Sequence, residues 1–428
     1  MPTIKTLTGY EILDSRGRPT VLAVCQLVSG AKGAASVPSG ASTGSSEALE
    51  LRDGDPTRYR GLGCRKAAGH VSGVIQDALA HRTFDSHSTL DRALIELDGT
   101  PNKARLGANA ILAVSLAFAR AAAVEQDMPL YRYFGALLSE TPHALPLPTI
   151  NLFSGGKHAG GQVAIQDVLV VPVAAHTMDE ALSMAFAVYQ AAADLVFRKY
   201  RMRPLTADEG GLAPAFDSPV AMLEDAVEAI HAAGFQPGAD IALAVDVAST
   251  HFYRDGRYHL GGESLDSQGM ITHLLGWLER YPIISIEDGL AEDDWDYWPE
   301  LRAQAGEGVQ ILGDDLLCTN PSRIRRAVDQ QAANALLLKV NQIGTLSEAA
   351  EACALAKASG WRIVVSARSG ETEDDWLADL AVGWSADHIK VGSITQSERL
   401  AKYNRLLLLE AQTGFMMKRV KNTKSKSS

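Results

Sequence analysis

Short apolar segments alternate with helix-like segments through the second half of the 428-residue chain. Five of the apolar segments are rich in leucine or β-branched residues, and each predicts a buried parallel strand. They are IALAVD, PIISIED, VQILGDD, ALLLKVNQ and HIKVG. Because strand-like and helix-like segments keep alternating from Thr149 to about residue 412, the pattern predicts a (β/α) barrel.

Each of these five segments carries a charged residue at its end: Asp246, Glu287, Asp314, Lys339 and Lys390. Removing such a charge from water is costly unless it is paired, binds a metal or lies at an exposed strand end. Barrels of this kind carry their chemistry at the carboxyl ends of the strands. Three convergent carboxylates suit a hard cation such as Mg²⁺, and a lysine beside a cation can act as a base. Structural ion pairing would explain any one of these charges far more readily than all five.

The first 135 residues have a different pattern. IKTLTGYEILDSRG and TVLAVCQLVSG predict two antiparallel strands joined by a turn at Gly17 and Pro19. The alanine-rich segment ANAILAVSLAFARAAAVEQ predicts a buried helix. Prolines at positions 142, 146 and 148 then indicate a domain boundary. We therefore expect an α+β domain over residues 1–135 and a barrel domain with the active site over residues 145–428.

Composition narrows the class of protein. A net charge of −11 argues against a broad nucleic-acid-binding surface, and 46% hydrophobic residues with 21% charged residues are typical of a soluble globular protein. No apolar run reaches the length of about 18 residues that would predict a membrane span, and the amino terminus lacks a signal-peptide pattern. The four cysteines show no CxxC spacing, which predicts free thiols in a reducing compartment, so we expect a cytoplasmic protein.

Three glycine-containing loops hold further candidates, each with a simpler alternative. PSGASTG (38–44) could approach a ligand closely and bind Mg²⁺ through a hydroxyl, or could be a surface turn. SGGKHAGG (154–161) contains His158, which could be functional or structural. DEGG (208–211) contains Glu209 but could be a plain β-turn.

A fourth loop, SARSGETED (366–374), follows the strand-like segment RIVV. Arg368 and Ser369 in this loop could hold a phosphate through a guanidinium and a hydroxyl. The alternative is a structural ion pair between Arg368 and Glu371 or Glu373.

The chain resembles the enolase family over nearly its whole length. The segments that carry the resemblance occur in order between residues 11 and 393: EILDSRGRPTV, PSGASTG, ALELRDGD, GANAILAVSLA, GGKHAGG, DEGGLAP, SIEDGL, GDDLLCTNP, LLLKVNQIGTL, ARSGETED and IKVGS. The resemblance implies an α/β fold in which an amino-terminal α+β domain caps an enolase-type (β/α)8 barrel that begins with two antiparallel strands. It also implies a lyase with two Mg²⁺ ions that removes a proton alpha to a carboxylate.

Matching positions imply residue roles. Asp246, Glu287 and Asp314 would bind the first Mg²⁺, and Ser42 the second. Lys339 would be the general base and Glu209 the general acid. The substrate-binding positions implied by the resemblance are Gly40, Ala41, His158, Gln166, Asp167, Arg368, Ser369 and Lys390.

Several positions depart from the family pattern. Ala367 stands where the family has histidine, and Asp167 stands where it has glutamate. The other departures are Ser154 for asparagine, Ala207 for glycine, Gln396 for arginine and Val391 for threonine. The metal and proton-abstraction residues therefore match, while those around the leaving group differ.

This division predicts a specialised lyase that acts on a 2-phospho- or 2-phosphono-glycerate, similar to the enolase-like carboxyphosphonoenolpyruvate synthases of phosphinate antibiotic pathways. An ordinary glycolytic enolase is the first alternative, and a non-catalytic scaffold on the same fold is the second. The family's dimers share a glutamate–arginine pair across the subunit interface, and this chain has Leu22 and Leu408 at those positions. Because both charges are replaced together, we expect a homodimer or higher homo-oligomer that keeps the contact.

Overall fold

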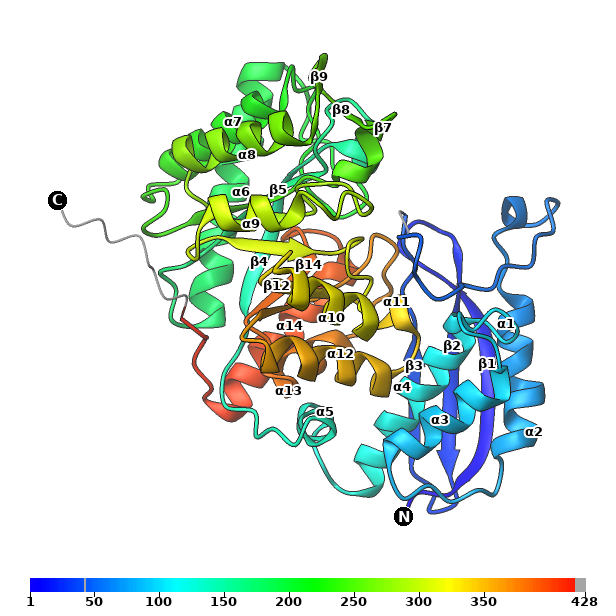
Figure 1. Ribbon diagram of the computed structural model, residues 1–428. Helices are drawn as coiled ribbons and strands as arrows, with labels where there is room; N and C mark the ends of the chain where they lie inside the picture. The colour runs from blue at the N-terminus through cyan, green and yellow to red at the C-terminus, as the bar shows by residue number, and fades with distance from the viewer. Residues whose placement is uncertain (42–43, 420–428) are drawn as a thin grey trace.

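The computed structural model describes residues 1–41 and 44–419 and consists of an amino-terminal α+β part beside a larger barrel (Figure 1). Three antiparallel strands form the amino-terminal sheet: β1 (Ile4–Leu13), β2 (Pro19–Leu27) and β3 (Lys32–Ser36). The predicted strand pair is confirmed, since β1 and β2 are antiparallel neighbours from Leu13↔Pro19 onward.

The described residues of this part form five α-helices. They are α1 (Arg65–His70), α2 (Gln76–Leu79), α3 (His87–Asp98), α4 (Ala108–Glu125) and α5 (Leu130–Leu137). Three of them, α1, α2 and α4, pack on the sheet. The predicted buried helix is α4, which packs on β2 and β3. The helix and sheet come very close at Gly33, where a Cβ atom would lie 2.3 Å from the carbonyl oxygen of Ala117. Only a residue without a side chain fits at this contact.

Eight strands close into the predicted barrel. They are β4 (Leu147–Ser154), β5 (Asp167–Val171), β6 (Ala242–Asp246), β10 (Ile283–Glu287), β11 (Gln310–Gly313), β12 (Ala335–Leu338), β13 (Arg362–Ser366) and β14 (His388–Gly392). β5 is antiparallel to both of its neighbours, β4 and β6, whereas the other neighbouring pairs are parallel. The expected start with two antiparallel strands is therefore confirmed.

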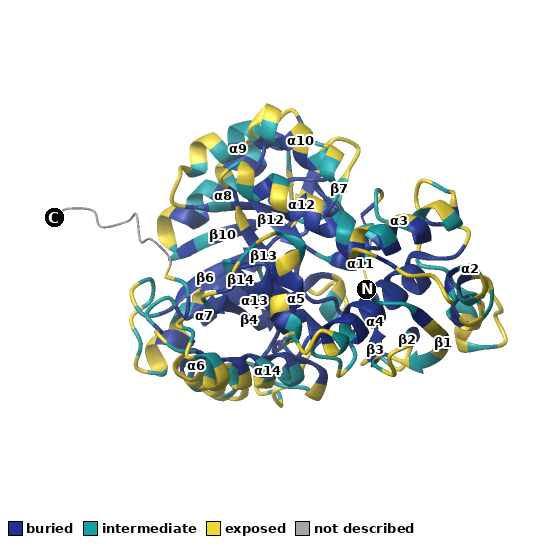
Figure 2. Cartoon of the chain, turned by 90° about the horizontal axis from the view of Figure 1, so that it is seen from below, coloured by how far each residue is buried: buried dark blue, intermediate teal, exposed yellow. Residues whose placement is uncertain are grey.

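Helices surround the barrel, so its strands are buried and the exposed positions lie on the outer helix faces (Figure 2). The helices are α6 (Met178–Tyr200), α7 (Pro219–Ala232), α8 (Ser267–Arg280), α9 (Trp298–Ala305), α10 (Pro321–Gln330), α11 (Val340–Ile343), α12 (Leu346–Ala358), α13 (Trp376–Gly383) and α14 (Ser397–Thr413). Several begin at side-chain caps: Thr177, Ser218, Asp266 and Thr345 each accept a hydrogen bond from a backbone N–H three residues later. A separate small sheet contains β7 (Tyr253–Arg254), β8 (Arg257–Leu260) and β9 (Glu263–Leu265).

Two helices, α4 and α6, are long and apolar enough to cross a membrane by length and composition alone. Neither helix is an uninterrupted apolar run of about 18 residues, because α4 contains Asn109 and Arg120 and α6 contains Gln190 and Asp194. Most of α4 is buried inside the protein, as is half of the apolar stretch of α6. Core helices of soluble proteins pass the same test, so the two helices are weak evidence for a membrane span.

Candidate active site at the carboxyl ends of the barrel strands

Four of the five predicted strand-end charges lie where the sequence placed them. Asp246 and Glu287 are the last residues of β6 and β10, and Asp314 and Lys339 directly follow β11 and β12. Lys390 differs, because it is the middle residue of β14. That strand continues past Lys390, since Gly392 still pairs with Ile150 of β4.

The Lys390 ammonium group bridges two of the carboxylates. Its Nζ atom donates to Asp246 Oδ2 at 2.8 Å and to Glu287 Oε2 at 2.7 Å. All three side chains are buried. Burial disfavours the charged amine, but the charges of Asp246 and Glu287 outweigh this effect and raise the pKa of Lys390 well above its ordinary value. Lys390 is therefore a fixed positive charge among the strand-end acids.

Lys339 contacts the third carboxylate. Its Nζ atom donates to Asp314 Oδ2, and Gln342 donates to Asp314 Oδ1 at 2.8 Å. The Lys339 backbone N–H donates to the Thr319 hydroxyl at 2.9 Å, which fixes the start of the loop after β12. Burial lowers the pKa of Lys339, but the charge of Asp314 more than offsets this and leaves it raised.

Some of the strand-end oxygens suit a hard cation, although Asp246, Glu287 and Asp314 do not form one of the groups of described residues whose ligand atoms all lie within 4.8 Å of one another. Among the described residues, Glu287 Oε1 and Gln166 Oε1 are buried oxygens with no hydrogen-bond partner. Burial and the negative charge of Asp246 also raise the pKa of Glu287 well above its usual range. These oxygens could serve as ligands of a divalent cation, whose charge would relieve the repulsion between the acids. Gln166 is tied to the same group, since its amide donates to Asp246 Oδ2 at 3.2 Å.

A second acidic group follows β10 and β11. Asp288, Asp314 and Asp315 bring ligand oxygens within 4.8 Å of one another. Asp288 accepts the backbone N–H groups of Asp314 at 2.9 Å and Asp315 at 2.8 Å, so it holds the turn that presents Asp314. Sequence reasoning named Glu287 and Asp314 but missed Asp288 and Asp315, although the doubled acids in SIED and GDD were visible. Ser42, the predicted ligand of the second cation, lies outside the described residues.

His158 lies between two acids. Its Nδ1 atom is 3.1 Å from Asp167 Oδ2, and its Nε2 atom is 3.7 Å from Glu209 Oε1. Ser154 donates to the other Asp167 oxygen at 2.5 Å, and the Asn151 amide donates to Glu209 Oε2 at 3.1 Å. Sequence reasoning did not name Asn151, although this buried residue belongs to the same strand as Ser154.

The charges in this group depend on one another. Burial lowers the pKa of His158, but Glu209 and Asp167 outweigh burial and raise it to about 9. Burial raises the pKa of Asp167 despite the opposing His158 charge. For Glu209, burial raises the pKa, but the positive charge of His158 and the other nearby cations together have the larger effect, and the pKa of Glu209 is lowered. At neutral pH the group therefore carries its proton on His158 rather than on Glu209.

Arg368 lies on the side of the site that faces the amino-terminal domain. Its guanidinium donates to both Glu47 oxygens, at 3.1 and 3.2 Å, and to Asn341 Oδ1 at 3.1 Å. Glu371, an alternative partner expected from the sequence, instead accepts the Arg368 backbone N–H at 3.1 Å and pairs with Lys402 at 2.9 Å. No local pattern pointed to Glu47, which is far from Arg368 along the chain.

Arg16 joins the Gly40 loop to Ser369. Its guanidinium donates to the Ser369 hydroxyl at 3.1 Å, to the Ser39 carbonyl at 3.0 Å and to the Gly40 carbonyl at 3.4 Å. Ala41, the next predicted substrate-binding residue, is exposed. Arg16 was not among the residues predicted from the sequence.

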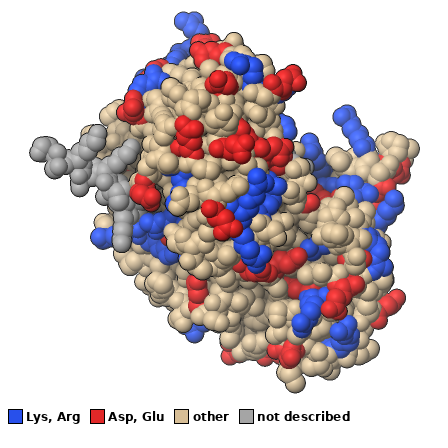
Figure 3. Space-filling view, viewed as in Figure 1, with Lys and Arg blue, Asp and Glu red and all other residues tan. Residues whose placement is uncertain are grey.

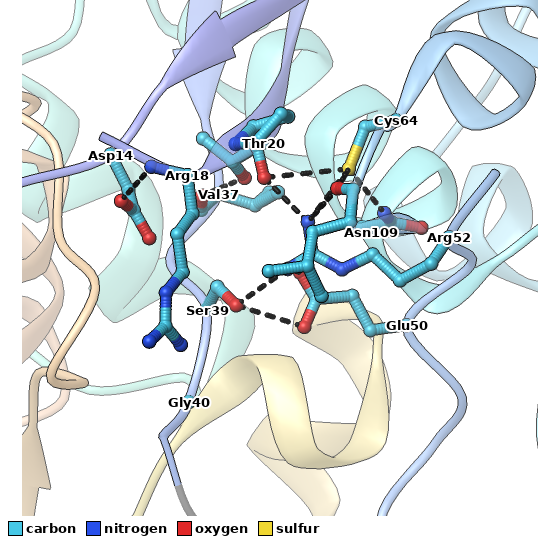
Figure 4. Close-up of polar contacts among 12 residues, drawn as sticks. Asp14, Arg18, Thr20, Val37, Ser39, Gly40, Glu50, Arg52, Cys64 and Asn109 are labelled. Carbon is cyan, nitrogen blue, oxygen red and sulfur yellow. Dashed lines mark hydrogen bonds and ion pairs between the residues drawn. The ribbon is translucent and has the colours of Figure 1, made fainter. Parts of the chain in front are cut away.

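The base of this loop is held by a partly buried polar network (Figure 4). Arg52 donates to the Pro19 carbonyl at 2.6 Å, the Leu62 carbonyl at 2.8 Å and the Ser39 hydroxyl at 2.8 Å. Ser39 in turn donates to Glu50 at 3.0 Å. One guanidinium thus ties the start of the Gly40 loop to the amino-terminal sheet.

Ala367 directly follows β13 and has no functional side chain. Its backbone N–H donates to the Lys390 carbonyl at 2.8 Å, so the pairing of β13 with β14 continues past Ser366. Arg399 is fully buried and donates at 2.6 Å to each of the Arg368 and Ser369 carbonyls. The backbone of this loop is therefore fixed, although the side chain at position 367 is short.

Two protein-family models match the chain. Residues 142–426 match the model described as "Enolase, C-terminal TIM barrel domain". Residues 4–134 match the model described as "Enolase, N-terminal domain". The two matches leave only short segments of the chain uncovered.

Proposed function

Because the chain belongs to the enolase family, we propose that it is a Mg²⁺-dependent lyase that forms an enediolate from a 2-phospho- or 2-phosphono-glycerate and eliminates a group from C3. The observation that carries the proposal is the contact of Lys390 with both Asp246 and Glu287, beside Lys339 on Asp314. This arrangement places a candidate base and a fixed positive charge around acids that suit a cation. The product would be an enolpyruvate.

Asp246, Glu287 and Asp314 would hold one Mg²⁺, and Ser42 would contribute to a second. Bound Mg²⁺ would supply the positive charge that a dianionic enediolate requires, in keeping with this superfamily's established pairing of a lysine or histidine base with Mg²⁺. Lys339 would take the C2 proton on its Nζ atom in its neutral form, which a cation held by Asp314 would favour by offsetting the negative charge that raises the pKa of Lys339. Lys390 would stabilise the substrate carboxylate as negative charge develops there.

His158 and Glu209 together could supply the proton that the leaving group requires. A general acid must hold a proton, but the pKa of Glu209 is lowered, and that of His158 is raised to about 9. Since the two side chains lie 3.7 Å apart, we propose that His158 stores the proton and Glu209 receives it or positions the leaving group. Arg368 and Ser369 would bind the phosphate or phosphonate, and Gly40, Ala41, Gln166 and Asp167 would line the substrate site.

Two observations favour a specialised substrate over 2-phosphoglycerate. The residues that differ from the family pattern include Asp167 and Ala367, at positions that the resemblance implies lie around the leaving group. A cavity of about 650 Å³ also lies beside the loop of His158 and is lined in part by Lys157, His251, Arg254 and His259. We therefore propose a substrate with a larger C2 substituent or a different leaving group, as in a carboxyphosphonoenolpyruvate synthase. We also propose a cytoplasmic homo-oligomer that uses a small-molecule substrate and binds neither nucleic acid nor membrane.

The test uses Mg²⁺ and 2-phosphoglycerate in deuterated water. Mass spectrometry of recovered substrate measures exchange of the C2 proton, and ultraviolet absorbance measures phosphoenolpyruvate. We expect exchange to be faster than product formation, and we expect Lys339→Met to abolish both. Product formation as fast as exchange would instead identify a glycolytic enolase. No exchange with any phosphoglycerate or phosphonate analogue would favour a scaffold, an outcome that the retained buried charges argue against.

A further inference from the structure

A second hollow lies at the opposite end of the barrel from the candidate active site. Its volume is about 240 Å³. Three of its lining residues, Gln310, Arg362 and His388, are the first residues of β11, β13 and β14. Because these strands are parallel, their first residues meet at the amino ends of the strands. We call this hollow, lined by Gln310, Arg362, Asp387, His388, Lys418 and Arg419, the amino-end pocket.

Positive charge exceeds negative charge in the amino-end pocket. Asp387 pairs with Arg362 at 3.1 Å and with Lys418 at 3.5 Å, and it accepts the Ile363 backbone N–H at 2.9 Å. Burial disfavours the Asp387 charge, but the neighbouring Lys418 outweighs it and lowers the pKa of this acid. One carboxylate is therefore shared between two cations.

Arg419 adds a third cation, and the other acid at the pocket, Glu307, is exposed. Basic side chains are visible on the surface beside the end of the described chain (Figure 3). The cationic side chains that line the pocket outnumber the acids, so the pocket should attract an anion. Guanidinium groups bind carboxylate and phosphate oxygens in a fixed geometry.

The floor of the pocket is polar but uncharged. His388 is 4% exposed, and burial lowers its pKa to about 4. Its Nε2 atom is 3.0 Å from the Gln310 amide nitrogen, and its Nδ1 atom is 3.3 Å from the Thr149 hydroxyl. Since the neutral imidazole accepts from Gln310 at Nε2, its proton lies on Nδ1 and is donated to Thr149.

Apolar packing, rather than a polar floor, is what usually stabilises this end of a barrel. His388 and Gln310 also line a much smaller cavity inside the barrel, whose other lining residues include Glu287 and Lys390. The floor of the amino-end pocket thus separates it from the interior beneath the candidate active site.

We propose that the amino-end pocket binds a small organic anion, whose carboxylate or phosphate group contacts Arg362 and Arg419 while its polar remainder contacts Gln310. This site is separate from the catalytic residues, and the proposal does not depend on the reaction that those residues catalyse. Carboxylate and phosphate share the oxyanion chemistry that the two guanidinium groups recognise.

Isothermal titration calorimetry with the full-length protein in Mg²⁺ buffer tests the proposal, with inorganic phosphate and malonate as separate probes. Arg368→Gln removes a predicted phosphate ligand of the active site, and binding that remains in this variant is assigned to the amino-end pocket only where a substitution in that pocket weakens it. In that background, we expect Arg362→Gln to weaken binding of at least one probe about ten-fold, and Arg419→Gln to weaken it to a similar extent. Arg325→Gln is the matched control, because Arg325 is exposed and pairs with Glu351 outside the pocket.

The two probes separate the sources of the anion. Binding of phosphate alone indicates a phosphate ester, binding of malonate alone indicates a carboxylic acid, and either result supports the proposal. It is overturned if neither probe binds the Arg368→Gln protein saturably, or if Arg362→Gln and Arg419→Gln bind as tightly as Arg325→Gln. Arg419 is exposed, so its variant keeps the test valid even if Arg362→Gln fails to fold.

Discussion

Ser154 donates a hydrogen bond of 2.5 Å from its hydroxyl to Asp167, the residue directly opposite it in the β4–β5 pair. Both residues depart from the enolase pattern, and both are shorter than the residues they replace. The two changes are therefore one local rearrangement, in which a short donor meets a short acceptor. The other Asp167 oxygen still faces His158, at 3.1 Å.

This pairing explains how the site can lose side-chain length without leaving a buried acid unsatisfied. An unpaired buried carboxylate would be strongly destabilising. Asp167 has one partner on each oxygen, so its shortened side chain keeps a defined position. What changes is the length of the side chain at position 167, and Ala367 likewise has a shorter side chain than the family's histidine.

The first prediction concerns the cation. Glu287→Gln should weaken Mg²⁺ binding by at least about 100-fold, because loss of a direct ligand should exceed the effect of losing an outer partner. The protein should stay folded, since the neutral amide removes a carboxyl whose pKa is already raised by burial and Asp246. Calorimetry measures the affinity and thermal melting the stability. Glu228→Gln, at an exposed position of α7, is the control, and equal Mg²⁺ affinity in both variants would disprove the assignment.

The second prediction concerns pH. The pKa of His158 is about 9 in the folded protein, although burial alone would lower it, so the histidine should be protonated at neutral pH. Because this pKa is above the unfolded value of about 6.5, its contribution to stability is complete below pH 6.5 and is lost as pH rises toward 9. Asp167→Asn removes one of the charges that raise the pKa and should move the titration to lower pH. Nuclear magnetic resonance of the ring would contradict this if His158 in the unmodified protein titrated at or below pH 6.5.

The sequence predicted those parts of the site that follow from local pattern. Asp246, Glu287, Asp314 and Lys339 are at strand ends because each closes a short apolar segment, and that pattern is visible without a structure. Lys390 was placed at a strand end but lies within β14, because the pairing of Gly392 with β4 extends the strand. A single apolar segment does not show how far its neighbour's pairing will reach.

Contacts between distant segments could not be predicted in this way. Glu47 and Arg368 are 321 residues apart, and Arg16 and Ser369 are 353 residues apart, yet both pairs are in contact. The local pattern around Glu47 describes only a polar segment. These partners depend on how the amino-terminal domain lies against the barrel, which is a property of the folded chain.

The third prediction concerns the oligomer. Leu408 is 54% exposed on α14, and Leu22 is partly exposed on β2, so both are available at the surface of a single chain. If they meet across a dimer interface, Leu408→Arg would bury an unpaired charge and weaken the dimer by roughly 3 kcal/mol. Analytical ultracentrifugation at low micromolar concentration measures the change. Val124→Arg, at another exposed apolar position, should have no effect, and a similar profile for the two variants would rule out this contact.

The last prediction concerns the side of the site that has diverged. Combining Asp167→Glu with Ala367→His restores the family residues around the leaving group and should raise the formation of phosphoenolpyruvate from 2-phosphoglycerate. Exchange of the C2 proton should change little, because Lys339, Lys390 and the cation-binding acids are untouched. The ratio of product formation to exchange is therefore the informative measurement.

Ser154 should limit how far the double variant raises the ratio of product formation to exchange. A longer acid at position 167 must be accommodated beside the Ser154 hydroxyl, now only 2.5 Å from Asp167, and misplacement by about 1 Å can reduce a rate on the order of 100-fold. Adding Ser154→Asn, which restores the third family residue, should therefore increase the ratio beyond that of the double variant. Ala207→Gly, which restores a family residue outside this hydrogen-bonded group, is the matched control for the third substitution. If the triple variant with Ser154→Asn forms no more product per exchange event than the unmodified protein, the departures at these positions do not limit dehydration, and the proposed division of the site is wrong.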